Sequence, residues 1–112
     1  MEIINGNTAD ERLVLAAADG AITIADSTVL ITKATAAALT LAAPTAAKNG
    51  TKITIVATTA AAHTVTATTI GFNAGNAGTD LGTFGGAIGD GLTVIAYSGE
   101  WYVISNINVT FS

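Results

Sequence analysis

The chain contains no cysteine, and only 11% of its 112 residues are charged. Without cysteine it has no disulfide framework, no thiolate nucleophile and no cysteine-bound zinc. Basic residues are also scarce, because four lysines and arginines stand against eight acidic residues, for a formal net charge of −4. Nucleic-acid binding requires a basic face that neutralises phosphates, so we do not expect nucleic acid as a partner.

Long apolar runs are missing too. No stretch approaches the roughly 18 uninterrupted apolar residues of a membrane-spanning helix. Residues 1–6 lack the basic and apolar regions of a signal peptide. The sequence therefore predicts neither a membrane partner nor a secretion signal.

Small and β-branched residues are abundant instead. Half of the residues are hydrophobic and the mean hydropathy is +0.57, which excludes a disordered acidic tail. Alanine (23), threonine (19) and glycine (12) supply 54 of the 112 residues. Because alanine and glycine bury little surface, either the fold is unusually regular or subunits share a core, and we expect both.

Apolar and polar residues alternate along most of the chain, a pattern typical of β-strands with one buried face. The alternating segments are residues 21–25, 28–32, 39–41, 52–56, 63–68, 92–97, 101–104 and 108–111. Turn-forming pairs such as Asp19-Gly20, Asn49-Gly50 and Ser98-Gly99 separate them. The alanine-rich segments 33–38 and 58–62 are too short to persist as helices and are predicted as loops.

This pattern predicts an all-β fold, a small antiparallel sandwich or jelly-roll-like barrel with short loops. We expect residues 20–112 to form a single β domain. Residues 1–19 are expected to be either an extended N-terminal arm or a first strand.

The C-terminal hairpin can be predicted in most detail. If Ser98-Gly99 is a two-residue turn, Ala96 faces Trp101 and Val94 faces Val103. One face of the hairpin then lines the core, with Leu92, Val94, Ala96, Trp101 and Val103. The other face is also apolar, although a solvated face should be polar, so we expect a loop or another subunit to cover it. The candidate oligomer-interface residues are Ile95, Tyr97, Tyr102 and Ile104.

Few residues are candidates for catalysis. His63 is the only histidine, and the chain lacks the nucleophile motif and gathered carboxylates of a triad. We interpret His63 as a strand-end residue that hydrogen-bonds to backbone or lies near a symmetry axis. The glycine-rich segment 85–91 has a spacing like that of a phosphate-binding loop, but it precedes a strand and contains Asp90, so we predict an ordinary turn.

The aspartates in turns lack the spacing of a calcium-binding loop, and we expect each to cap the backbone of its own turn. These residues are Asp19, Asp26, Asp80 and Asp90. The sequence therefore predicts a protein that is not an enzyme and that binds no cofactor and no metal.

Four segments resemble small virion proteins of tailed bacteriophages, in particular the head decoration, or cement, proteins. They are residues 38–45 (ALTLAAPT), 61–66 (AAHTVT), 83–91 (TFGGAIGDG) and 101–103 (WYV). The resemblance covers residues 20–112 and implies a non-enzymatic, homotrimeric β protein on the capsid surface of the virion. It implies that the major capsid protein is the partner, that the chain reinforces contacts between capsid subunits, and that it is made in the host bacterial cytoplasm.

This role needs a segment that reaches the capsid, and the candidate arm residues are Ile3, Ile4, Leu13 and Leu15. The alternative is a receptor- or glycan-binding module of a fibre or tail tip, in which Trp101 and the tyrosines would stack on sugars. The hairpin register, however, places Trp101 on the face opposite Tyr97 and Tyr102. A small glycan hydrolase is a further alternative, and it would require Asp80, Asp90 or Glu100 to cluster in a pocket.

Overall fold

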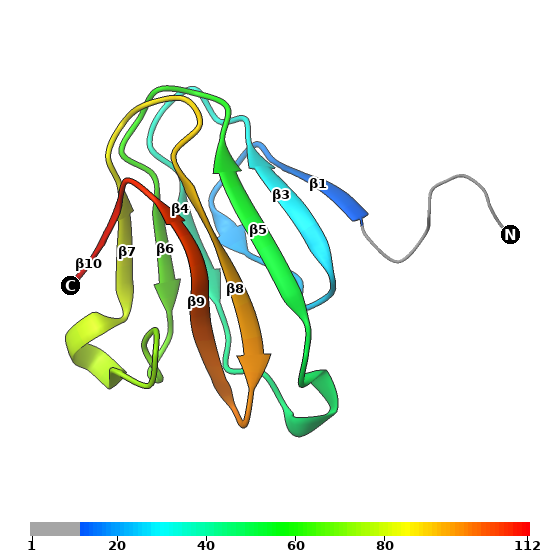
Figure 1. The fold of residues 1–112 in the computed structure, drawn as a ribbon. Coiled ribbons are helices and arrows are strands. Elements are labelled where there is room, and N and C mark those ends of the chain that lie inside the picture. Colours follow the sequence, from blue (N-terminus) through cyan, green and yellow to red (C-terminus); the bar gives the residue numbers. More distant parts are fainter. Residues whose placement is uncertain (1–11) are drawn as a thin grey trace, which may run out of the picture.

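The computed structural model describes residues 12–112, whose strands form two sheets of five strands each (Figure 1). Sheet A contains, in spatial order, β1 (Arg12–Ala16), β3 (Ser27–Ile31), β5 (Lys52–Ala57), β8 (Gly91–Tyr97) and β9 (Glu100–Ile107). Sheet B contains β10 (Val109–Phe111), β7 (Leu81–Phe84), β6 (Thr64–Ala67), β4 (Ala38–Leu41) and β2 (Gly20–Ala21). The prediction of an all-β sandwich is confirmed.

Two single-turn 3-10 helices, η1 (Ala46–Lys48) and η2 (Asn76–Thr79), lie in the connections between strands. Within residues 12–112, no helix has the length and hydropathy needed to cross a membrane. The segments 33–38 and 58–62 are irregular as predicted, except that Ala38 begins β4, and they lie in the connections from β3 to β4 and from β5 to β6. Each of these segments therefore crosses from sheet A to sheet B.

The chain alternates between the two sheets from β1 to β6. Each return to a sheet adds a strand parallel to the previous one, so β1, β3 and β5 are parallel, as are β2, β4 and β6. The pairings made by β7 to β10 are antiparallel. The sheets are therefore mixed, where we expected antiparallel ones. The reason is that period-two alternation reports which face of a strand is buried, and not the direction of its neighbour.

The core lies between the two sheets and consists of every second residue of the strands. In β5, for example, Ile53, Ile55 and Ala57 are buried whereas Lys52 and Thr54 are not. Trp101 of β9 is fully buried, and its Nε1 donates a hydrogen bond to the carbonyl oxygen of Ala42 at 2.8 Å. This bond ties sheet A to the end of β4 in sheet B and satisfies the one polar atom of the largest core side chain.

The C-terminal hairpin has the predicted register, with Ala96 opposite Trp101 and Val94 opposite Val103. Ser98 and Gly99 both have positive φ (52° and 79°), as the type I′ turn of a two-residue hairpin requires. Further along, the register shifts by one residue, and Ile104 is the extra residue of a β-bulge.

β1 belongs to the segment 1–19 and lies at the edge of sheet A. It pairs in parallel with β3, so that Leu13 lies beside Thr28 and Leu15 beside Leu30. Residues 1–11, which include the candidate arm residues Ile3 and Ile4, lie outside the described residues.

Candidate functional site

The outer face of the C-terminal hairpin carries the four predicted interface residues on two neighbouring strands. Tyr97 and Ile104 are exposed (62% and 53%), whereas Ile95 and Tyr102 are half-buried. Ile95 lies directly opposite Tyr102, and these two side chains share one face of the sheet. The bulge displaces Ile104 from the regular pairing, so it is beside this pair and not part of a flat row.

A second apolar feature crosses the whole of sheet A, and we call it the apolar row. Its members occupy matching register positions on the five strands. They are Leu15, Leu30, Val56, Gly91 and Ile107. Leu15 and Ile107, at the two edges, are about 60% exposed. Gly91 leaves a gap because a Cβ there would lie 2.2 Å from the carbonyl oxygen of Ile55.

The apolar row unites one predicted site residue, Leu15, with four residues that sequence reasoning missed. The alternation of Leu30 and Val56 with buried neighbours indicates that both face outwards, but it does not indicate that they adjoin. Their adjacency follows from the parallel pairing of β1, β3 and β5, which is a property of the fold and not of any local pattern.

The outer face of sheet A has little charge. The charged residues of its five strands are Arg12, Lys52 and Glu100, and each is the first residue of its strand. Between the apolar row and the Ile95–Tyr102 pair lies a row with mostly hydroxyl side chains, in which Thr54 Oγ1 and Thr93 Oγ1 are 3.0 Å apart. The middle of this face is therefore neutral and half apolar, a composition typical of surfaces that another protein covers.

The outer face of sheet B is less apolar than that of sheet A. Its strands contain no charged residue, and its outward positions are mostly threonines. The register places Thr64 beside Thr83 and Thr83 beside Thr110, while Thr40 lies beside Thr66. This face is neutral but hydroxyl-rich, so sheet A offers the more apolar surface for association.

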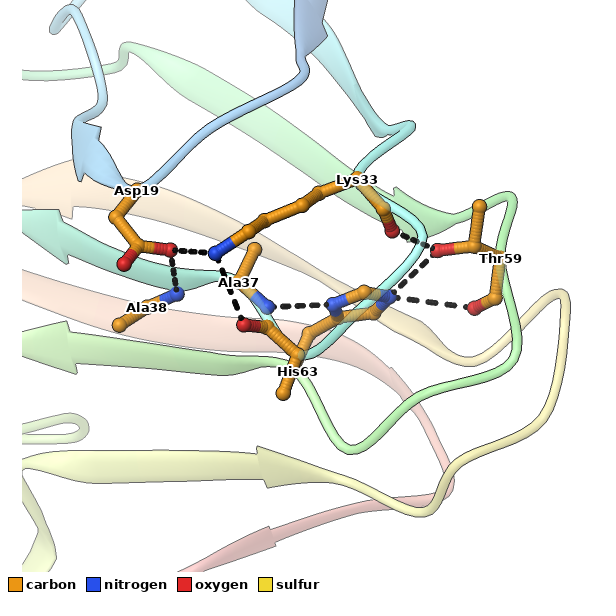
Figure 2. Close-up of polar contacts among 7 residues, drawn as sticks. Asp19, Lys33, Ala37, Ala38, Thr59 and His63 are labelled. Atoms are coloured by element: carbon orange, nitrogen blue, oxygen red, sulfur yellow. Dashed lines mark hydrogen bonds and ion pairs between the residues drawn. The ribbon is translucent and has the colours of Figure 1, made fainter.

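His63 lies at the start of β6, where the β3–β4 and β5–β6 connections meet, and it is fully buried (Figure 2). Its Nδ1 accepts a hydrogen bond from the backbone amide of Ala37 at 3.0 Å. Its Nε2 lies 3.0 Å from Thr59 Oγ1 and 3.2 Å from the Thr59 carbonyl oxygen. The interpretation of His63 as a strand-end residue bonded to backbone is confirmed.

These contacts fix the protonation of the imidazole ring. Nδ1 accepts a hydrogen bond from an amide, so it has no proton. Thr59 Oγ1 donates its proton to the carbonyl oxygen of Lys33, and it must therefore accept a hydrogen bond from Nε2–H. Both nitrogens of the neutral ring are engaged within the fold, and neither faces a cavity in which it could exchange a proton with a substrate.

Asp19 makes the equivalent link between the β1–β2 and β3–β4 connections. Its Oδ1 accepts hydrogen bonds from the backbone amide of Ala38 and from Lys33 Nζ, both at 2.9 Å (Figure 2). The amide of Ala38, and secondly the Lys33 ammonium group, hold the pKa of the Asp19 carboxyl below its ordinary value. Asp19, Lys33 and His63 therefore link the three connections that cross from sheet A to sheet B between β1 and β6. Their hydrogen bonds hold these connections together.

Two further candidate acids, Asp90 and Asp26, also bind backbone. Asp90 is buried, and its Oδ2 accepts hydrogen bonds from the Ala87 amide and from Asn108 Nδ2. Asp26 Oδ1 accepts one from the Lys52 amide. In residues 12–112, no three histidine or acidic side chains gather as a metal site would require.

A groove of about 300 Å³ lies at the edge formed by β1, β2 and the connection between them, which we call the open end. Val14 and Ala16 of β1, Ile22 after β2, and Val29 and Leu39 from the neighbouring strands contribute apolar lining. The groove therefore opens between the two sheets, where a further pair of strands would otherwise continue the sandwich.

Comparison of the chain with models of protein families, with curated proteins and with solved structures gives no match in any of the three. The surfaces and contacts described above are thus the structural basis for a functional proposal. Of these, the outer face of sheet A is a neutral surface with exposed apolar side chains, including Leu15, Tyr97 and Ile104.

Proposed function

We propose that the chain is a structural protein of a tailed-phage particle. It binds the outside of the capsid as a homotrimer and reinforces contacts between major capsid subunits. The sequence segments that resemble decoration proteins suggest the particle, and the neutral outer face of sheet A is the observation that carries the association.

The outer face of sheet A favours a second copy of the chain as its first partner. Ile104, Tyr97 and Ile107 expose large apolar surface within the span of β8 and β9. Burying apolar side chains on two adjacent strands is most favourable when the covering surface is also flat and uncharged, because no charged group must then be desolvated. In a trimer, copies of this face would meet around the threefold axis, with the hairpin of one copy against a different part of the same face on the next copy.

A trimer would bind a capsid through several modest contacts at once. Once one subunit of the trimer is bound, the other two subunits are at a high effective concentration near their sites. The trimer therefore binds more tightly than a single subunit would. Leu13 and Leu15, the two exposed leucines of β1, are the proposed capsid contacts among the described residues, and Ile3 and Ile4 extend that proposal into the N-terminal segment.

The glycan-binding alternative has less support. Trp101 is fully buried in the core, so the aromatic platform would consist of Tyr97 and Tyr102 alone. Two tyrosines on a β-hairpin are equally suited to an interface between subunits.

The test of the oligomer is the mass in solution of Ile104→Asp and Tyr102→Asp chains, measured by light scattering. We expect the unaltered chain to be a trimer at micromolar concentration and both variants to be monomers with unchanged strand content. Thr110→Asp, on an exposed position of sheet B, is the matched control and should stay trimeric. If Ile104→Asp also stays trimeric, the proposed interface is wrong.

The test of the capsid role is co-sedimentation with the parent particle, followed by electron cryo-microscopy. We expect density for the chain on the outer head shell, and loss of binding in the monomeric variants. Density on a fibre or on the tail tip would instead support the receptor- or glycan-binding alternative.

A further inference from the structure

Glu100, the first residue of β9, has a carboxylate oxygen that the fold buries without a hydrogen-bond partner. In residues 12–112, its Oε1 is the one buried side-chain oxygen or nitrogen of this kind. The carboxylate of Asp90, by contrast, accepts hydrogen bonds from the Ala87 amide and from Asn108 Nδ2. Because a buried acceptor without a donor is unfavourable, Glu100 would be stabilised by a donor from outside the chain.

The carboxylate lies beside the proposed interface. Glu100 is opposite Tyr97 across the hairpin, and Tyr102 is two residues further along β9. All three side chains therefore belong to the outer face of sheet A. Glu100 as a whole is only half-buried, so its carboxylate can turn towards a donor that lies above this face.

Lys52 is the basic residue that the strands of sheet A place on the same face. It is the exposed first residue of β5, and it lies beside Ile95, which in turn lies opposite Tyr102. Arg12, the other basic residue of these strands, is aligned through β3 with the buried Ile53 and so belongs to the inner face. Lys52 is thus the complementary charge on the face that carries Glu100.

Lys52 and Glu100 of one chain do not bond to each other. β8 lies between β5 and β9 (Figure 1), so two strand spacings of about 4.8 Å each separate the two residues. Within residues 12–112, the ion pair is Asp19–Lys33. Since β5 and β9 are both antiparallel to β8, their first residues lie at the same end of the sheet. This end of the face therefore has a positive and a negative group that are not paired with each other.

We propose that Lys52 of one copy pairs with Glu100 of the next copy in the trimer. The inference rests on the proposed function and names the contact that orients its interface. In a ring of three copies, each copy meets its two neighbours with different parts of its surface. The hairpin of one copy can therefore lie against β5 of the next, and three equivalent pairs form at the rim of the apolar contacts.

The experiment exchanges the two charges and measures the mass in solution by light scattering. Glu100→Lys and Lys52→Glu each bring like charges together at every pair, so we expect each variant to need at least about a tenfold higher concentration to form trimers. The double variant restores opposite charges and should form trimers as readily as the unaltered chain. Lys48→Glu makes the same charge change in η1, outside the strands of sheet A, and is the matched control.

The outcomes separate the pair from the trimer itself. Single variants that form trimers as readily as the unaltered chain would overturn the pair and leave the trimer standing, as would a double variant as weak as the single ones. An unaltered chain that is a monomer would overturn the proposed function and the pair with it. Lys52 is exposed, so Lys52→Glu tests the pair even if Glu100→Lys fails to fold, and circular dichroism reports the strand content of each variant.

Cross-linking of trimers assembled from unlabelled and isotope-labelled chains is the second measurement. A carbodiimide condenses a carboxylate with an amine to an amide and takes up the water as a urea, so it joins Glu100 to Lys52 only where the two side chains touch. We expect cross-linked peptides that combine a labelled with an unlabelled chain. Products confined to one chain, or a link from Glu100 to Lys48 in place of Lys52, would overturn the proposal.

Discussion

The two ends of the sandwich differ in how the chain fills the space between the sheets and covers their edge strands. At the end formed by β9, β10 and the connection 68–80, which we call the closed end, Phe72 is buried against Phe111, and Asn73 bonds to the backbone edge of β9. At the open end, the corresponding connection contains Ala17, Ala18 and Asp19, which are all exposed. Closing an end of a two-sheet stack therefore requires a large apolar side chain and an edge cover, and small residues leave a groove.

The hydrogen bonds between the crossover connections are likewise more exposed next to the open end and more buried away from it. The Asp19–Lys33 pair, next to the open end, is exposed, whereas the hydrogen bond of His63 with Ala37 is buried and that with Thr59 is partly buried (Figure 2). Buried hydrogen bonds matter more to stability because water cannot replace a lost partner. The comparison thus predicts that substitutions become less damaging from the closed end to the open end.

The largest effect is expected from Phe72→Ala. Removing a fully buried phenylalanine leaves a cavity between Trp101 and Phe111, and such truncations reduce the free energy of unfolding by about 3–5 kcal/mol. Leu15→Ala, at the open end, should change it by no more than about 0.5 kcal/mol because the side chain is mostly exposed. Urea denaturation followed by Trp101 fluorescence measures both.

The difference in unfolding free energy between Phe72→Ala and Leu15→Ala tests whether the closed end is buried and the open end exposed. If Leu15→Ala were as destabilising as Phe72→Ala, Leu15 would be buried in the protein in solution, and the open end would not be open. Light scattering of the same sample at several concentrations would then separate burial within one chain from burial between copies.

The second largest effect is expected from His63→Ala. The substitution leaves the buried Ala37 amide without an acceptor and removes the ring that packs edge-on against Phe84 at 6.0 Å. Together these losses should reduce the free energy of unfolding by roughly 3 kcal/mol. His63→Gln retains a side-chain acceptor and should lose less. Equal loss in the two variants would mean that the ring, and not the hydrogen bond, stabilises the crossovers.

Local features of this fold could be predicted from the sequence, and long-range ones could not. The hairpin register followed from Ser98-Gly99 because a two-residue turn fixes the pairing of its own strands. The parallel pairing of β1 with β3 joins segments that no turn connects, so alternation alone could not reveal it.

For the candidate site residues, too, local features were predictable and long-range contacts were not. The buried face of the hairpin was predicted correctly, and Tyr97 and Ile104 are exposed where an interface would need them. The burial of Phe72 at the closed end was missed, although a lone phenylalanine in the glycine- and asparagine-rich segment 71–78 was a signal. Likewise, Asp19 was expected to cap its own turn, but it binds an amide 19 residues away.

A smaller effect is expected from Asn73→Ala, which removes the polar cover of β9 and keeps Phe72. The Val103 amide loses its acceptor at the edge of the sheet, and alanine is less tolerant than asparagine of the positive φ of 56°. We expect a loss of about 1 kcal/mol, since the site is partly open to water. Faster hydrogen exchange at Val103 is the local readout, and unchanged exchange there would show that the side chain does not protect the edge.

The smallest effect is expected at Asp19, and it should depend on pH. Because the folded-state pKa of Asp19 is lowered, the carboxylate stabilises the fold at every pH above its ordinary value of 3.8, and this contribution is lost as the pH falls through the lower folded-state pKa. Asp19→Asn should therefore flatten the acid side of the stability profile and leave stability nearly unchanged at low pH. Lys33→Met should preserve most of the pH dependence, since the Ala38 amide is the main cause of the shift. Salt should weaken the Lys33 contribution, because the pair is exposed. An Asp19 carboxyl that titrates at 3.8 by NMR in the unaltered chain would contradict the hydrogen bond to Ala38, and with it the contact that joins the open end to the next crossover.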